Sequence, residues 1–151
     1  MNLEAFILGS GGMMPLPHRH LTSMLLRREG ELFLFDAGEG TQVSLRRLNL
    51  RWKKITAIFI SHTHADHVTG LDDLRRFNSL QHAPLNCYAN AHTLHVLHRM
   101  FPYAFTHDPT YPSAKPELNM VEVDGEFEAA GMRVTPVPLL HGKLPILGYR
   151  I

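Results

Sequence analysis

The chain has 151 residues, of which 44% are hydrophobic, and a formal net charge of +1. This length fits a single domain, and so small a charge excludes a global electrostatic attraction to nucleic acid. No apolar run reaches the roughly 18–20 residues of a membrane-spanning helix, and the N-terminus lacks the basic flank of a signal peptide. The lone Cys87 fits a reducing compartment, so we expect a cytoplasmic protein without a membrane partner.

Short apolar segments alternate with amphipathic ones along the chain, which predicts an α/β layered domain. In chain order, the predicted elements are a strand at 3–8, a β-hairpin at 23–36 that turns at Glu29 and Gly30, a helix at 41–50 with Thr41 as its N-cap, a buried strand at 55–60, a helix at 70–80, a strand at 84–90, a helix at 91–101, and strands at 120–123 and 132–139.

The segment 101–118 is rich in proline and aromatic residues and is too long for a bare connector. Loops of this length are usually functional or lid-like, so we expect it to cover a substrate. Within it, His107 is a candidate for a proton or phosphate contact. The chain stops at Ile151 inside what reads as a strand, which predicts a domain truncated at its C-terminus.

The densest chemical feature is IFISHTHADHVTGL at 58–71, where His62, His64, Asp66 and His67 directly follow an apolar strand. In an extended segment alternate side chains share a face, so His62, His64 and Asp66 are predicted to point the same way. Imidazole and carboxylate groups are ligands for zinc and similar metals. Four buried ionisable groups without partners would each cost several kcal/mol, so a metal site is the better interpretation than an ordinary core.

SHTHADH resembles the signature loop of the metallo-β-lactamase superfamily, which has a four-layer αββα sandwich and a two-metal hydrolytic site. The resemblance implies that His62 and His64 bind one divalent ion together with His141, and that Asp66 and His67 bind another. It also implies that Asp66 orients the attacking water and accepts its proton. Zinc is the expected metal, with manganese or iron as alternatives. Paired ions of this kind activate water and stabilise charge on a scissile phosphate.

Residues 5–71 are more specifically similar to ribonuclease Z, the endonuclease that trims the 3′ end of transfer RNA precursors. GEGTQ at 38–42 is the most particular part of this likeness, and the preceding Asp36 is expected to hydrogen-bond the metal loop. The resemblance implies a precursor transfer RNA substrate and a homodimer of the intact protein.

Beyond Gly70 the likeness changes, because RMFPYAF and VTPVPLLHGKLPILGY resemble the phosphoribosyl cyclic phosphodiesterases. The alternative substrate is therefore a small cyclic phosphate ester. Family members also use an aspartate and a histidine downstream of the third histidine, and this sequence contains neither. The chain is thus expected to be the N-terminal half of a metallo-β-lactamase-fold domain over 1–151, and a metal-binding but inactive fragment is a third hypothesis.

Other histidines and cations have weaker signals. His18 and His20 lie in a loop similar to a region near the ribonuclease Z active site, where phosphate contact and simple loop polarity are equal alternatives. The helical spacing of His92, His95 and His98 favours a solvated helix face over a second metal site. A basic run comprising Arg46, Arg47, Arg51, Lys53 and Lys54 favours a solvated helix end over an RNA-binding surface.

Overall fold

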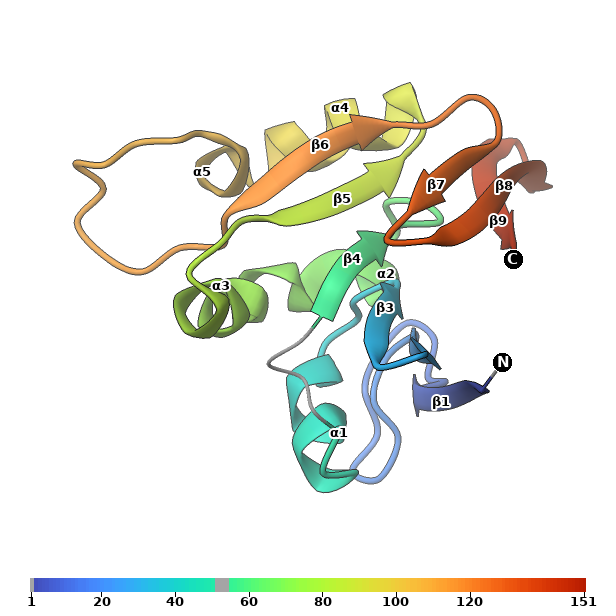
Figure 1. Cartoon of the computed structure of the whole chain (residues 1–151), viewed down its shortest axis with the longest axis horizontal. Helices are drawn as coiled ribbons and strands as arrows, with labels where there is room; N and C mark the ends of the chain where they lie inside the picture. The colour runs from blue at the N-terminus through green and yellow to red at the C-terminus, as the bar shows by residue number, and fades with distance from the viewer. Residues whose placement is uncertain (1, 51–54) are drawn as a thin grey trace.

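The computed structural model of the chain describes residues 2–50 and 55–151 and contains two β-sheets (Figure 1). The six-stranded sheet has the order β1-β2-β3-β4-β5-β6, and its strands are β1 (Leu3–Gly9), β2 (Ser23–Arg28), β3 (Glu31–Phe35), β4 (Ile55–Phe59), β5 (Leu85–Ala89) and β6 (Leu118–Glu122). The three-stranded sheet consists of β7 (Phe127–Ala129), β8 (Met132–His141) and β9 (Leu144–Arg150).

Helical segments connect the strands of the larger sheet. They are α1 (Thr41–Arg47), α2 (Ala65–Val68), the 3-10 helix η2 (Thr69–Leu74), α3 (Arg75–Gln81), α4 (Ala91–Met100) and α5 (Pro102–Phe105). From β3 to β6 all neighbouring strands are parallel, as helical crossovers require, whereas β1, β2 and β3 are antiparallel. The alternation of strand and helix predicted from the sequence is confirmed.

The predicted hairpin is formed by β2 and β3, in which Arg28 pairs with Glu31 across the turn. Glu29 and Gly30 both have positive φ, at 51° and 93°, which is the backbone twist that two-residue hairpin turns require. The strand predicted at 55–60 is β4, whose neighbours are parallel on both sides. A central parallel strand is covered on both faces, which explains its nearly unbroken apolar sequence.

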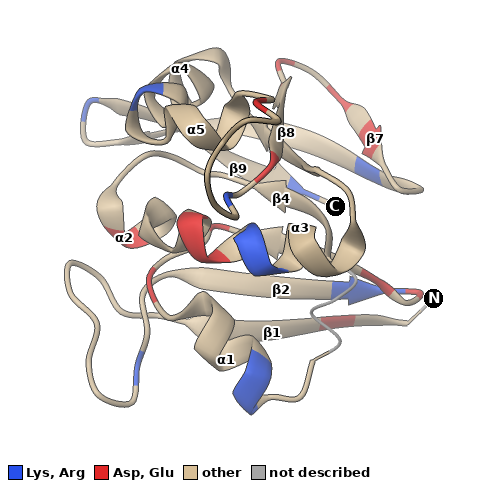
Figure 2. Cartoon of the chain, turned by 90° about the vertical axis from the view of Figure 1, so that its left-hand side faces the viewer, with Lys and Arg blue, Asp and Glu red and all other residues tan. Residues whose placement is uncertain are grey.

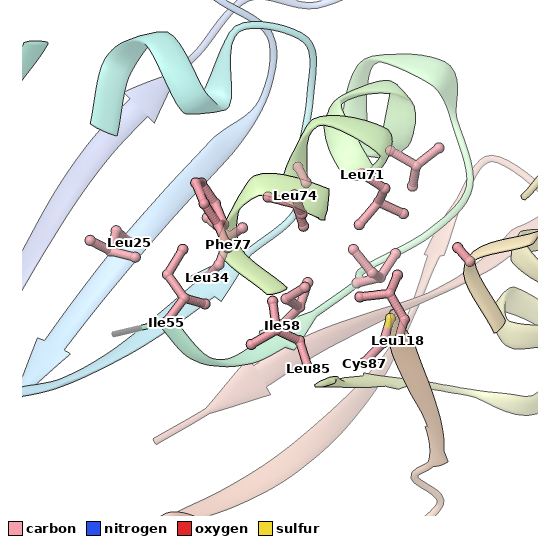
Figure 3. Packing of buried hydrophobic residues seen from close by; sticks show 14 of the residues in the cluster. Leu25, Leu34, Ile55, Ile58, Leu71, Leu74, Phe77, Leu85, Cys87 and Leu118 are labelled. Atoms are coloured by element: carbon pink, nitrogen blue, oxygen red, sulfur yellow. The ribbon is translucent and has the colours of Figure 1, made fainter. Parts of the chain in front are cut away.

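The helices pack on one face of the six-stranded sheet and form the larger hydrophobic core with it (Figure 3). Leu74 and Phe77, from η2 and α3, lie over Leu34 and Ile58 of the central strands. Cys87 on β5 is fully buried in this core, and burial raises the pKa of its thiol to about 12. The thiol therefore packs in the core and is not a nucleophile, in agreement with the apolar sequence around it.

The three-stranded sheet covers the opposite face of the larger sheet through an aromatic cluster. The Phe59 ring stacks on Phe35 and on Tyr88 at centroid distances of 4.7 and 5.1 Å, and Tyr88 stacks on Phe127 of β7 at 5.0 Å. Tyr149 of β9 meets Phe59 edge-on at 5.3 Å. The domain thus has a layer of helices, a six-stranded sheet and a three-stranded sheet, consistent with the expected α/β class.

The elements differ from the sequence predictions at both ends of α1 and in two further segments. The N-cap of α1 is Gly40 rather than Thr41, because Gly40 has a left-handed φ of 90° and Thr41 is already helical. The helix ends at Arg47 instead of residue 50. The short strand β7 was not predicted, and α5 lies inside the segment 101–118 that was expected to be a functional or lid-like loop, opening with Pro102 at a position where proline costs no hydrogen bond.

Within residues 2–50 and 55–151, no helix is long and apolar enough to cross a membrane. Two residues of the basic run, Arg46 and Arg47, are exposed in the last turn of α1. Cations at this position are stabilised by the negative, carbonyl end of the helix dipole. Arg51, Lys53 and Lys54 lie outside the described residues.

Candidate metal centre

The polar motif lies where β4 ends and α2 begins. His64 is the N-cap of α2, with extended backbone angles of φ −61° and ψ 143°, and the helix starts at Ala65. The extended backbone therefore includes His62 and His64 but not Asp66, which lies with His67 inside α2. The predicted alternation of His62, His64 and Asp66 on one face is wrong for Asp66 because the chain turns helical before it.

His62 and His64 meet His141, which is the last residue of β8 in the other sheet. One ligand atom from each of these three side chains lies within 4.8 Å of the others. The ring centroids of His62 and His64 are 4.6 Å apart, and those of His64 and His141 are 5.1 Å apart. The structure thus brings together the three histidines that the sequence resemblance implied for one ion, although His64 and His141 are 77 positions apart in the sequence.

Hydrogen bonds from β9 hold the second sheet, and with it His141, against the end of β4. The Tyr149 hydroxyl lies 2.9 Å from the Ile60 carbonyl oxygen and 3.1 Å from that of Tyr88. The Leu147 amide donates to the Ser61 carbonyl at 2.9 Å. Since β8 and β9 form one antiparallel hairpin, fixing β9 also fixes the position of His141.

Asp36 ties the metal loop to the end of β3. Its Oδ1 accepts the Ser61 amide at 2.8 Å, and its Oδ2 accepts the Ser61 hydroxyl, also at 2.8 Å. The same Oδ2 lies 2.8 Å from Nδ1 of His67. A carboxylate only accepts hydrogen bonds, so His67 carries a hydrogen on Nδ1 and presents Nε2 away from Asp36. Asp36 therefore contacts the metal loop as expected. Through its contact with His67, it is placed to orient a candidate metal ligand.

The Ser61 hydroxyl extends this network to His62, whose Nδ1 lies 2.9 Å from Ser61 Oγ. Because the hydroxyl hydrogen is donated to Asp36, the Ser61 oxygen accepts from Nδ1 of His62, which leaves Nε2 of His62 as a free acceptor. Ser61 was not singled out from the sequence, although its place directly before the histidines was the available signal.

The two histidines held by this network have opposite pKa shifts. Burial, followed by the neighbouring His67, lowers the pKa of His62 from 6.5 to about 4. Burial also acts to lower the pKa of His67, but the hydrogen bond and the negative charge of Asp36 raise it above its usual value. His62 is therefore a neutral imidazole at pH 7, which is the protonation state that binds a metal.

The residues fit a metal ion. Nε2 of His62 is buried and has no hydrogen-bond partner among the described residues, although a buried polar atom without a partner costs about 1–3 kcal/mol. An ion held by His62, His64 and His141 would satisfy that nitrogen with ligands of the type that zinc prefers. Asp66 and His67 lie alongside, with Asp66 Oδ2 and His67 Nε2 4.0 Å apart.

Glycines allow the segment before α1 to approach the metal loop closely. A Cβ atom on Gly38 would lie 2.4 Å from the Asp66 carbonyl oxygen, and one on Gly70 would lie 2.4 Å from the Gly38 carbonyl oxygen. The Ala37 amide donates to the His67 carbonyl at 2.7 Å. Gly38 of the GEGTQ motif and Gly70 are therefore required by close backbone contact beside the metal loop.

The remaining candidate residues do not belong to the histidine cluster. His18 and His20 line a separate pocket against α1. His107 is exposed near the first residues of β5 and β6, whereas the metal loop follows the last residue of the parallel strand β4, so His107 lies at the other end of the sheet (Figure 1). His92, His95 and His98 are exposed on α4 and belong to no metal-ligating group among the described residues.

The layered α/β fold and a histidine cluster that follows the carboxyl end of a parallel strand are the features of a metallo-β-lactamase type of domain, and the cluster could hold a metal ion. A family model described as "Beta-lactamase superfamily domain" matches residues 32–151. The chain therefore belongs to the β-lactamase superfamily, as the SHTHADH motif predicted.

Ribonuclease Z proteins are similar to the N-terminal part of this chain. Its N-terminal part is 85% identical over 79 residues to ribonuclease Z of Treponema pallidum and 81% identical to that of Treponema denticola. These matches cover 52% of this chain but only 26% of each relative. The chain thus matches about a quarter of the length of these curated relatives.

Similar solved structures cover almost the whole chain. A diphosphatase of the PhnP family has a TM-score of 0.81 and 30% identity over 99% of this chain and 63% of its own. The short form of human tRNase Z has a TM-score of 0.71 and 30% identity over 96% of this chain and 62% of its own. Both predicted resemblances, to ribonuclease Z and to cyclic phosphodiesterase relatives, are therefore confirmed as similarities.

Proposed function

We propose that the chain belongs to a metal-dependent phosphodiesterase of the ribonuclease Z type, which removes 3′ trailers from transfer RNA precursors. The observation that carries this proposal is the cluster of His62, His64 and His141, in a chain whose N-terminal part is 85% identical to a ribonuclease Z. The proposal includes a cytoplasmic location and a homodimer of the intact protein, both expected from the sequence.

The proposed roles are those that the family resemblance implies, and the positions of the side chains support them. His62, His64 and His141 hold one divalent ion, and Asp66 with His67 contributes to holding a second. Such ions supply Lewis-acid stabilisation of phosphate charge and an activated water. Asp66 accepts the proton of the attacking water, while the Met13 amide, which donates to Asp66 Oδ2 at 3.3 Å, helps to orient that carboxylate. Asp36 holds His67 in the tautomer that leaves its Nε2 available.

A second candidate is hydrolysis of a small cyclic phosphate ester, as in the phosphoribosyl cyclic phosphodiesterases. The observation that favours it is the similarity to a PhnP-family diphosphatase, which extends over 99% of this chain with a TM-score of 0.81. Both candidates use the same histidine cluster and the same chemistry, so the substrate is what distinguishes them.

The decisive experiment offers both substrates to the same zinc- or manganese-loaded protein. We expect cleavage of precursor transfer RNA at its 3′ trailer, detected on a denaturing gel, and much slower hydrolysis of a ribose cyclic phosphate. Uncut precursor together with rapid hydrolysis of the cyclic ester would establish the second candidate instead.

Metal content and general phosphodiesterase activity test the third hypothesis, an inactive metal-binding fragment. Elemental analysis is combined with hydrolysis of bis-p-nitrophenyl phosphate by the same preparation. Two metal ions per chain with turnover would exclude the inactive fragment, and one ion per chain without turnover would establish it.

A further inference from the structure

Gln42, the last residue of the GEGTQ motif, joins α1 to the helical segment that contains Asp66 and His67. Its Nε2 donates a hydrogen bond of 2.7 Å to Oδ2 of Asp73 in η2. Because η2 directly follows α2 in the chain, Asp73 belongs to the same continuous segment as the two candidate metal ligands. Figure 2 shows α1 and this segment on the same side of the sheet, with the acidic turn of η2 between α2 and α3. The bond therefore connects the start of α1 to the segment that presents Asp66 and His67.

Backbone hydrogen bonds connect the same two parts of the chain. The Ala37 amide donates to the His67 carbonyl oxygen at 2.7 Å, and the Gly70 amide donates to the Ala37 carbonyl oxygen at 2.8 Å. The attachment points on the helical segment are thus His67, Gly70 and Asp73, each separated from the next by one helical turn. In a 3-10 helix, residues one turn apart lie on the same side, so Gly70 and Asp73 both lie on the side toward α1. The Gln42 bond therefore continues a row of contacts along one side of the segment.

The presence of Gln42 at this position is not explained by stability alone. Its Oε1 atom is buried and has no hydrogen-bond partner among the described residues. A buried acceptor without a partner destabilises a fold, and an apolar side chain of similar length would avoid this penalty. The Asp73 carboxylate only accepts hydrogen bonds, so the amide nitrogen of Gln42 has to point toward it and Oε1 has to point away. What Gln42 supplies here is therefore the bond to Asp73.

We propose that Gln42 and Asp73 are positioning residues for the second metal subsite, formed by Asp66 and His67, a proposal that rests on the proposed function. Metal ligands have to be held at fixed positions, and groups that do not touch the ion supply much of that restraint. Asp36 orients the His67 ring through Nδ1. The bond between Gln42 and Asp73 instead restrains the backbone from which both ligands project. It therefore acts on Asp66 as well as on His67.

The first test measures amide hydrogen exchange by NMR in the metal-free chain. Q42M removes the amide and its unpartnered oxygen but keeps an unbranched side chain of similar size. Exchange should become at least about tenfold faster at Ala37 and Gly70, because local opening of the segment exposes their amides. The Leu147 amide, which bonds Ser61 between the sheets, should exchange at an unchanged rate. The midpoint of urea unfolding should be unchanged or higher, since the buried unpartnered acceptor is gone.

The second test titrates the same chains with zinc by isothermal titration. In Q42M the affinity for the second zinc equivalent should fall by about threefold to tenfold, less than for loss of a group that contacts a ligand directly, while the first equivalent is unchanged. The matched control is D72N, at the neighbouring carboxylate of η2. Asp72 contacts Tyr103 and Arg75 instead of Gln42, so D72N should stay within about twofold of the unchanged chain in both experiments. Equal effects of D72N and Q42M would contradict the proposal.

A double-mutant cycle shows whether the two side chains act through their mutual bond. D73A removes the other partner, and Q42M/D73A should exchange no faster at Ala37 and Gly70 than the single variants, because one bond is lost only once. Additive effects, or a uniform acceleration at all amides, would contradict the positioning role. The exchange experiment needs neither metal nor substrate. A chain that takes up no second zinc ion or leaves precursor transfer RNA uncut would contradict the proposed function, whereas unchanged exchange in Q42M would contradict the role of Gln42.

Discussion

The two parts of the candidate metal centre are assembled in different ways. The cluster of His62, His64 and His141 combines side chains from both sheets, and it exists only because the two sheets pack together. The pair Asp66 and His67 belongs to a single short helix, and one carboxylate, Asp36, orients its histidine. The first part therefore depends on tertiary packing over a long stretch of chain, and the second depends mainly on local sequence.

This difference predicts that the two parts respond separately to mutation. Changes between the sheets should disturb the histidine cluster first, because His141 is positioned through β9 and its bonds to Ile60 and Ser61. Changes at the end of β3 should disturb His67 first, because Asp36 contacts it directly. Separate measurements at each part can therefore show whether the two parts are independent.

The largest effect is expected from H141A, which removes the ligand contributed by the second sheet. Loss of a group that only hydrogen-bonds a metal ligand weakens metal binding by up to about 100-fold, and loss of a ligand itself should cost more. Zinc affinity should therefore fall by more than about 100-fold, and hydrolysis of bis-p-nitrophenyl phosphate should fall with it. Isothermal titration with zinc measures the first effect. His92 is exposed on α4, so H92A serves as the control and should bind zinc normally; an equal loss in both variants would refute this assignment.

A large loss of stability is expected from F59A, since Phe59 is fully buried at the centre of the aromatic cluster between the sheets. Truncation of a buried phenylalanine typically costs about 3–5 kcal/mol of unfolding free energy. Urea unfolding of the metal-free chain measures this cost. M14A changes a side chain that is 66% exposed and should cost less than about 0.5 kcal/mol.

An intermediate effect is expected from D36N, which keeps the shape of the side chain but removes the charge that holds His67. Loss of such a supporting group typically weakens metal binding about 10–100-fold. The prediction is a selective loss of the second zinc equivalent in a titration, while the first equivalent still binds. D124N, at an exposed carboxylate, is the control, and loss of the first equivalent in D36N would contradict the separation of the two parts.

A smaller effect is expected from Y149F, which deletes the hydroxyl beside the Ile60 and Tyr88 carbonyl groups. Leaving a buried acceptor without its partner costs about 1–3 kcal/mol, and the Tyr88 carbonyl keeps the Ile60 amide as a donor. The midpoint of urea unfolding should therefore decrease while aromatic packing is retained. Zinc affinity should decrease less than in H141A, and an unchanged midpoint would show that β9 is held by other contacts.

The smallest effect concerns pH in the metal-free chain. His62, with its pKa lowered to about 4, contributes stability above pH 6.5 that is lost as the pH falls toward 4, because the unfolded chain takes up the proton first. His67, with its pKa raised, contributes stability below pH 6.5 that is lost as the pH rises through its folded pKa. Imidazole NMR titration checks both, and matching midpoints for His62 and His67 would contradict the assignment.

Much of this architecture follows from the sequence by local rules. The hairpin at β2 and β3 was predictable because Glu29 and Gly30 suit a tight turn, and β4 because an apolar run is typical of a central parallel strand. The candidate metal ligands of the SHTHADH motif could be proposed from the sequence because the motif is dense. The N-cap of α1 was placed on the wrong residue because Gly40 adopts a left-handed conformation, and a Cβ atom there would collide with the side chain of His20, a residue distant in sequence.

By itself, the sequence determined the alternation of strands and helices, the SHTHADH motif and the likeness to two groups of phosphodiesterases, since each depends on residues close together in the chain. Three placements became visible in the fold alone: His141 meets His62 and His64, Ser61 links His62 to Asp36, and His107 lies at the far end of the sheet. These placements depend on how the two sheets and the chain crossovers pack. A local sequence pattern does not encode which residues distant in the chain come into contact.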